Sequence, residues 1–177
     1  RPGMDGLSAT AFPSGVRNVP VEITEAISPL VIWRKEFRQD SGGAGTYRGG
    51  LGQVMELGLT EDVPFAFSAL FDRIEHPPEG RDGGQPGAAG RLSLGSGPDL
   101  AGKGTQTIPK GDRVVIEMPG GGGLGDPKSR EVEKVVDDVR SGLVSCAVAR
   151  ECYGVFIDDS DNLDVRATNL ARQRVGE

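Results

Sequence analysis

The sequence is poor in the residues that build metal centres, disulfide frameworks and membrane spans. It has two cysteines and one histidine, His76, among 177 residues. A disulfide framework needs more cysteines than this, and a typical zinc site needs several His or Cys ligands. No apolar run approaches the roughly 18 residues that a membrane-spanning helix requires. These shortages exclude a cysteine-stapled domain and predict neither a metal site nor a membrane partner.

Positive charge is also in short supply. The chain has 20 Lys and Arg against 26 Asp and Glu, a net charge of −6. Proteins that bind nucleic acid usually carry a clustered excess of positive charge, so we expect no nucleic-acid partner. We interpret Cys146 and Cys152 as small core-filling thiols of a reducing compartment, which predicts a cytoplasmic location. The chain begins at Arg1 rather than Met, which favours a piece of a longer protein.

Glycine is abundant, and it is clustered. The 28 glycines and 12 prolines make up about 23% of the chain, where average usage would give roughly 12%. The clusters lie at 42–52, 80–90, 95–104 and 120–125. Collagen would need glycine at every third position, and the well-patterned apolar segments between the clusters argue against disorder. The clusters therefore predict fixed backbone turns.

Period-two alternation predicts strands over the first part of the chain. In residues 31–38 we expect Val31, Trp33 and Phe37 to form the buried face, with Lys35 near a sheet edge. Residues 18–22 also form an apolar strand-like run. Further strands are predicted near residues 51–59, 65–71, 91–94, 105–108 and 113–118.

The pattern changes to a helical one after residue 126. Val132, Val135, Val136 and Val139 recur at helical spacing. A second helix is predicted from the cap Ser145 to Gly154, and a third after Asp161. The predicted fold class is α+β, with a β-rich body of six or seven strands, sandwich- or barrel-like, over residues 1–128. A helical tail over residues 129–177 completes what we expect to be one compact unit.

Two glycine clusters match nucleotide-binding motifs by letter. Residues 97–103 fit the first seven positions of a P-loop, but position eight is Gly104 and a strand follows where a helix is required. Residues 120–125 (GGGGLG) fit the dinucleotide fingerprint, but Pro127 and Ser129 delay the helix that should open there. We predict a turn before an edge strand for the first. For the second we favour a tight backbone crossing, with an active-site or interface loop as the alternative.

Two polar segments remain open between a functional and a structural interpretation. Residues 72–78 contain Arg73 and His76, and this histidine beside carboxylates has the chemistry of a general base. The alternative is a strand end with solvated charges. Asn18 and Glu22 likewise suit either a site or a local turn.

Seven ordered motifs resemble the hydantoinase B/oxoprolinase family. They lie at residues 18–22, 40–52, 72–78, 83–90, 102–104, 119–127 and 138–155. Members of this family are several hundred residues long, so the resemblance implies that this chain is the C-terminal third of a B-type subunit. It further implies an ATP-dependent hydrolase that opens cyclic amides such as N-methylhydantoin and 5-oxoproline, with phosphoryl activation of a stable amide oxygen.

The resemblance also implies partners and cofactors. A hydantoinase A-type subunit would bind ATP with Mg, and a divalent metal would sit in the missing N-terminal part of the B-type subunit. We expect no cofactor in this fragment and no activity from it alone. The alternatives are a non-catalytic β-rich subunit-assembly module, or the equivalent part of an acetone-carboxylase-type subunit.

No catalytic residue can be carried over from the family. Our candidates for substrate or subunit contacts are Asn18, Glu22, Arg73, His76, Gly120, Gly121, Gly122, Gly123 and Gly125.

Overall fold

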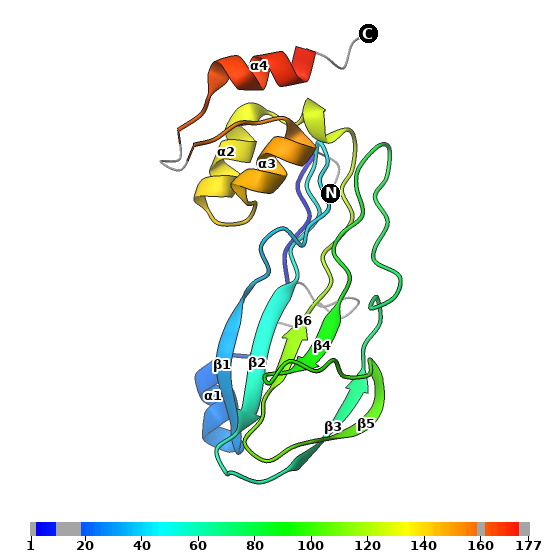
Figure 1. Cartoon of the computed structure of the whole chain (residues 1–177), viewed down its shortest axis with the longest axis vertical. Helices are drawn as coiled ribbons and strands as arrows, with labels where there is room; N and C mark the ends of the chain where they lie inside the picture. Colours follow the sequence, from blue (N-terminus) through cyan, green and yellow to red (C-terminus); the bar gives the residue numbers. More distant parts are fainter. Residues whose placement is uncertain (1–2, 10–18, 159–161, 174–177) are drawn as a thin grey trace.

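The computed structural model describes residues 3–9, 19–158 and 162–173. Strands lie at one end of the molecule and three helices at the other, with long loops running between them (Figure 1). The strands come from the segments in which apolar residues alternate. The helices at the opposite end come from the segments with helical spacing.

The strands form two antiparallel sheets. β1 (Leu30–Phe37), β2 (Gln53–Leu59), β6 (Val114–Glu117) and β4 (Arg91–Leu94) pair in that order, and β3 (Phe65–Leu70) pairs with β5 (Lys103–Ile108). Both sheets contribute to one core cluster, whose buried members are Ala69, Leu92, Ile108, Val114 and Ile116. The α+β class and the six strands of the described residues confirm the prediction. The barrel-like option is wrong, because among the described strands β1 and β4 each pair on one side only.

The outer strand β1 differs from its predicted pattern. Its register against β2 shifts between Ile32 and Arg34, so Trp33 has no partner in the ladder. Trp33 is 55% exposed, and the Arg113 guanidinium lies 3.9 Å from its ring centroid. Phe37 is also exposed, so the predicted apolar face is not buried. The bulge causes this difference, because it breaks the strict alternation on which the prediction relied. Lys35 does lie on an edge strand, as predicted.

The predicted strand-like run at 18–22 is wrong. Residues Val21–Ile27 form the helix α1, which has no buried residue. The helix lies along the free edge of β1, where the Glu25 carboxylate accepts a 2.8 Å hydrogen bond from the Ile32 amide. The Lys35 ammonium donates to the Val19 carbonyl at 3.1 Å. These contacts cover part of an edge that would otherwise be open for strand pairing.

The helical end follows the predicted pattern closely. After a 3₁₀ turn at Pro127–Ser129 come α2 (Val132–Arg140), α3 (Cys146–Tyr153) and α4 (Val165–Gln173). α2 and α3 contribute to one core cluster, whose buried members are Ala44, Val135, Val136, Val144, Ala149, Tyr153 and Val155. Within the described residues, none of the helices has the length and hydropathy needed to cross a bilayer.

Two details of this end differ from the predictions. Cys146 is exposed, so only the half-buried Cys152 fills space beside the core. The predicted cap Asp161 lies outside the described residues, and the Asp164 carboxylate accepts a 2.9 Å hydrogen bond from the Ala167 amide at the start of α4.

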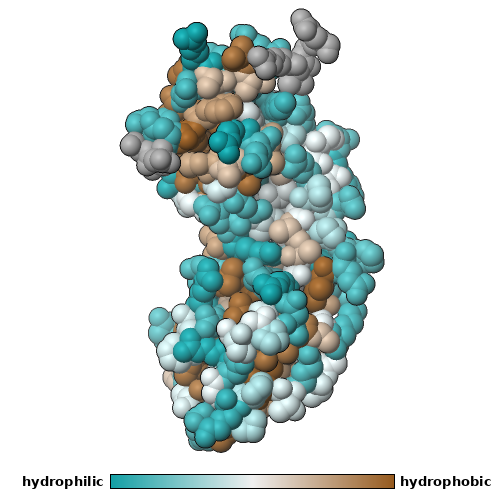
Figure 2. Space-filling view, in the orientation of Figure 1, coloured by the Kyte–Doolittle hydropathy of each residue, from teal (hydrophilic) through white to brown (hydrophobic). Residues whose placement is uncertain are grey.

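Between the two ends the molecule narrows to a neck, which is visible as an indentation in Figure 2. We define the neck as the segments 3–9, 38–52, 78–90 and 118–126, which run lengthwise side by side (Figure 1). Three of these segments contain three of the four glycine clusters, those at 42–52, 80–90 and 120–125. The neck therefore joins the sheets to the helices through backbone that has few side chains.

The cap of α3 gives a first test. The Ser145 hydroxyl accepts a 3.2 Å hydrogen bond from the Val148 amide, and Gly154 ends the helix with φ 64°. We expect Ser145→Ala to lower the free energy of unfolding by about 1 kcal/mol, because one amide of the first turn loses its acceptor. Urea denaturation measures this change. Ser141→Ala, at the exposed end of α2, is the control, and an equal loss in both variants would contradict the capping role.

Candidate functional site

The glycine run at residues 120–125 lies in the middle of the neck, where backbones approach very closely. A Cβ added to Gly120 would lie 1.8 Å from the Ser41 carbonyl oxygen. At Gly122 it would lie 2.0 Å from the Glu79 oxygen, and at Gly123 2.1 Å from the Ala44 oxygen. No real Cβ tolerates such distances from backbone atoms. These positions accept glycine alone, and the structure shows the predicted tight crossing.

Five of the six amides of this run donate to backbone carbonyls of neighbouring segments. Gly120 donates to the Ala88 carbonyl at 3.1 Å, Gly121 to Gly50 at 2.8 Å, and Gly123 to Gln85 at 2.9 Å. Leu124 and Gly125 donate to Tyr47 and Arg81. A dinucleotide site needs amides that point at a pyrophosphate from the start of a helix. Here they point at neighbouring backbone, and the run therefore does not have the geometry of a nucleotide loop.

Residues 97–103, which match the P-loop motif by letter, form a turn, as predicted. Gly97 has φ 118°, and its amide donates to the Leu94 carbonyl at 2.9 Å. Lys103 begins strand β5 and forms an ion pair with Asp72 at 2.9 Å. A P-loop lysine would instead stand at the start of a helix and face a phosphate.

The structure does not bring the predicted polar candidates together. Glu22 is exposed in the first turn of α1, beside β1. Arg73 and His76 are exposed on the segment that leaves β3, on the other side of the sheets (Figure 1). The backbone of this segment reaches the neck, where the Arg73 carbonyl accepts a hydrogen bond from the Gly90 amide at 2.8 Å. Asn18 lies outside the described residues, and the contact role of all four remains a prediction.

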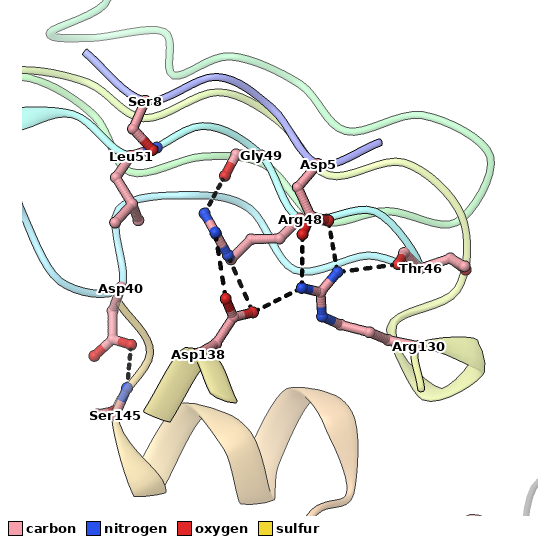
Figure 3. A network of polar contacts seen from close by, with 10 residues as sticks. All are labelled: Asp5, Ser8, Asp40, Thr46, Arg48, Gly49, Leu51, Arg130, Asp138 and Ser145. Carbon is pink, nitrogen blue, oxygen red and sulfur yellow. Dashed lines mark hydrogen bonds and ion pairs between the residues drawn. The ribbon is translucent and has the colours of Figure 1, made fainter. Parts of the chain in front are cut away.

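The structure instead reveals a buried charge network where the neck meets the helices (Figure 3). Arg130 donates to both carboxylate oxygens of Asp5, at 2.6 and 2.8 Å, and to Asp138 at 2.8 Å. Arg48 donates to the same Asp138 carboxylate at 3.2 and 3.4 Å. The side chain of Arg130 is 1% exposed and that of Arg48 is 6% exposed. Two cations and two anions thus neutralise each other, with both arginines and Asp138 buried and the Asp5 side chain 32% exposed.

The network connects parts of the chain that are distant in sequence. Asp5 lies on the neck segment 3–9, Arg48 on the neck segment 38–52, and Asp138 on α2. The Asp5 carboxylate also accepts a 2.8 Å hydrogen bond from the Arg48 amide. Through Asp5 and Asp138, the two arginines hold these two neck segments and the first helix of the helical end together.

The pKa values follow from these contacts. Burial alone would raise the pKa of Asp5, but the hydrogen bond and the charge of Arg130 lower it below its usual value. Burial would lower the pKa of Arg130, but Asp5 and Asp138 raise it. Burial raises the pKa of the nearby Tyr153 hydroxyl to about 12. At neutral pH Asp5 and Arg130 are therefore charged and Tyr153 is neutral.

The sequence-based predictions missed this network, although one signal was present. Asp138 is three positions after Val135, so it lies on the buried side of the predicted α2. A buried carboxylate needs a cationic or hydrogen-bonding partner. The identity of that partner was not readable, because Arg48 lies 90 residues away.

The described residues do not fit a metal ion. No group of three or more His, Cys, Asp or Glu side chains among them is placed to hold one. The carboxylates of the charge network, Asp5 and Asp138, already bind arginines. We therefore derive no metal-dependent or ATP-dependent step from this chain.

Comparison with known proteins agrees with the family resemblance of the sequence motifs. Residues 1–127 match the family model described as hydantoinase B/oxoprolinase. The chain belongs to the hydantoinase B/oxoprolinase family. The B component of a putative D-/L-hydantoinase from Pseudomonas sp. (strain NS671) is 34% identical over 180 residues, which cover 98% of this chain and 30% of the relative.

Two solved structures extend the match to the helical end. The ATP-dependent caprolactamase from Pseudomonas jessenii superposes with a TM-score of 0.77 and 34% identity, over 98% of this chain and 32% of that chain. A nucleotide-free acetone carboxylase gives a TM-score of 0.76 and 26% identity, over 97% of this chain and 28% of that chain. The chain thus spans about 30% of the length of these family members.

The close backbone crossing in the neck can be tested by substituting one of its glycines. We expect Gly122→Ala to lower the free energy of unfolding by several kcal/mol, because the new methyl group would overlap the Glu79 carbonyl. Gly58→Ala is the matched control, since its Cβ would meet the nearest atom at an ordinary 3.4 Å. Denaturant unfolding of both variants compares them. A Gly122→Ala chain as stable as the control would contradict the close crossing.

The charge network provides a second test. We expect Asp138→Asn to destabilise the fold by about 3–5 kcal/mol, because Arg48 and Arg130 would remain buried without their shared anion. The control is Asp137→Asn, which changes the neighbouring exposed carboxylate of the same helix. Thermal and urea denaturation measure the difference, and equal stability of the two variants would argue against a structural role for the network.

Proposed function

We propose that this chain is part of the B-type subunit of an ATP-dependent enzyme that hydrolyses cyclic amides. The observation that carries the proposal is the match over nearly the whole chain to the B component of the Pseudomonas hydantoinase and to the P. jessenii caprolactamase structure. Both of these relatives are named for reactions on amides, and the caprolactamase is named as ATP-dependent.

Within such an enzyme this chain would position the regions that carry out the chemistry. The amides of Gly120, Gly121, Gly123 and Gly125 are bonded to neighbouring backbone, and the carboxylates of Asp5 and Asp138 are paired with arginines. Glu22 is exposed on α1, apart from Arg73 and His76, which are exposed on the segment that follows β3. We therefore place ATP with Mg on a hydantoinase A-type partner and a divalent metal elsewhere in the B-type subunit, in a cytoplasmic complex. The chain alone would not turn over a substrate.

Two alternatives have support of their own. The match to acetone carboxylase favours the equivalent part of a carboxylating enzyme. The close backbone packing of the neck favours a subunit-assembly module. In such a module Gly120, Gly121, Gly122, Gly123 and Gly125 would serve only to dock or brace other parts.

An activity assay separates these possibilities. We would co-purify the complete B-type subunit with its A-type partner and supply ATP with hydantoin, 5-oxoproline, caprolactam or acetone. The expected result is ATP-dependent ring opening of a cyclic amide by the complex and no turnover by the 177-residue chain alone. Ring opening by the isolated chain would contradict the proposal, and carboxylation of acetone alone would favour the first alternative.

A variant in the same assay tests the role of the neck. We expect Gly122→Val in the complete subunit to abolish either complex formation or turnover, because the branched side chain cannot fit against the Glu79 carbonyl. Gly58→Ala should preserve both. Unchanged assembly and unchanged ring opening in the Gly122→Val complex would show that the crossing is not needed for function.

A further inference from the structure

Exposed large apolar side chains are concentrated around the outer strand of the four-stranded sheet. Twelve such side chains are exposed among the described residues, and five of them lie between residues 19 and 37. We call these five the β1 flank: Val19, Ile23, Ile27, Trp33 and Phe37. Single exposed apolar residues are ordinary, but five on one edge strand and the segment that leads into it are more than a single strand edge usually leaves exposed.

The helix of this flank has little support from the rest of the chain. α1 has seven residues, no side-chain cap and no buried residue. Its two isoleucines are one turn apart on the outside, with Ile23 51% and Ile27 80% exposed. An isolated helix of this length is marginal in water. A neighbour that covers Ile23 and Ile27 would supply the packing that α1 lacks.

The form of the edge limits what kind of neighbour can dock. Strand addition along β1 is blocked, because Glu25 occupies the Ile32 amide and the register is broken at Trp33. Trp33 and Phe37 are each more than half exposed. Buried aromatic residues are typical anchors of protein interfaces. The flank therefore suits a folded neighbour that packs through side chains.

We propose that the β1 flank is covered by the remainder of the same B-type subunit. The inference rests on the proposed function, since it takes this chain to be one region of a longer subunit. In the caprolactamase structure the matching region is only 32% of its chain, so most of that polypeptide lies outside it. Permanently covered surfaces are more apolar than surfaces that bind transient partners, and Ile, Trp and Phe fit the permanent class.

Thiol labelling of the complete subunit, purified without its partner, tests this proposal. Ile27→Cys is compared with Leu70→Cys, because Leu70 on β3 has a similar 86% exposure but lies away from the flank. Labelling with a maleimide is followed at the peptide level by mass spectrometry. We expect the introduced thiol at position 27 to react at least about tenfold more slowly than the one at position 70, since burial restricts access.

Each other outcome would overturn the proposal. Labelling at position 27 as fast as that of the exposed Cys146 would show that the flank stays exposed. Protection that requires the A-type partner would assign the flank to that subunit, and protection that rises with protein concentration would assign it to a second copy. Labelling needs no turnover, so a subunit without hydrolase activity could still show a covered flank, and the two proposals can fail separately.

Discussion

The structure depends on the absence of a side chain at a few positions in the neck. Gly120, Gly122 and Gly123 let three backbone segments approach to distances that even a methyl group would prevent. Because the segments are so close, their amides and carbonyls satisfy each other directly. A glycine-rich stretch of this kind is not a flexible linker. Its high glycine content is a packing requirement.

The charge network depends on this crossing in turn. Arg48 lies within the glycine-rich segment 42–52 that packs against residues 120–125, and the Asp5 carboxylate bonds to both the Arg48 amide and Arg130. Moving the segments apart would leave Arg48, Arg130 and Asp138 buried without complete partners, which is a costly state. The neck therefore fixes more than the spacing of the two ends. It also sets the electrostatic environment in which the helical end packs.

Local signals predicted the parts that local chemistry determines. The alternation at Arg91–Leu94 and the Ser145 cap with Gly154 gave the bounds of β4 and α3, because those features act over a few residues. α1 was mistaken for a strand because its alternating apolar residues are exposed and therefore carry no burial pattern. The pairing of Arg48 with Asp138 was beyond prediction, since a single sequence does not show which distant charges meet. The predicted polar candidates came from motif letters, and the fold places Glu22 apart from Arg73 and His76.

The crossing also has a consequence for the order in which the chain can fold. The Gly121 amide bonds to Gly50 and the Gly43 amide to Gly121, although these residues are far apart in the sequence. During synthesis, the backbone of residues 41–50 must wait for residues 120–125 to emerge from the ribosome before it has its partners. Contacts of this range slow folding, and unpaired backbone in the meantime favours wrong association. The feature that makes the finished neck so well satisfied thus makes the nascent chain dependent on its own later residues.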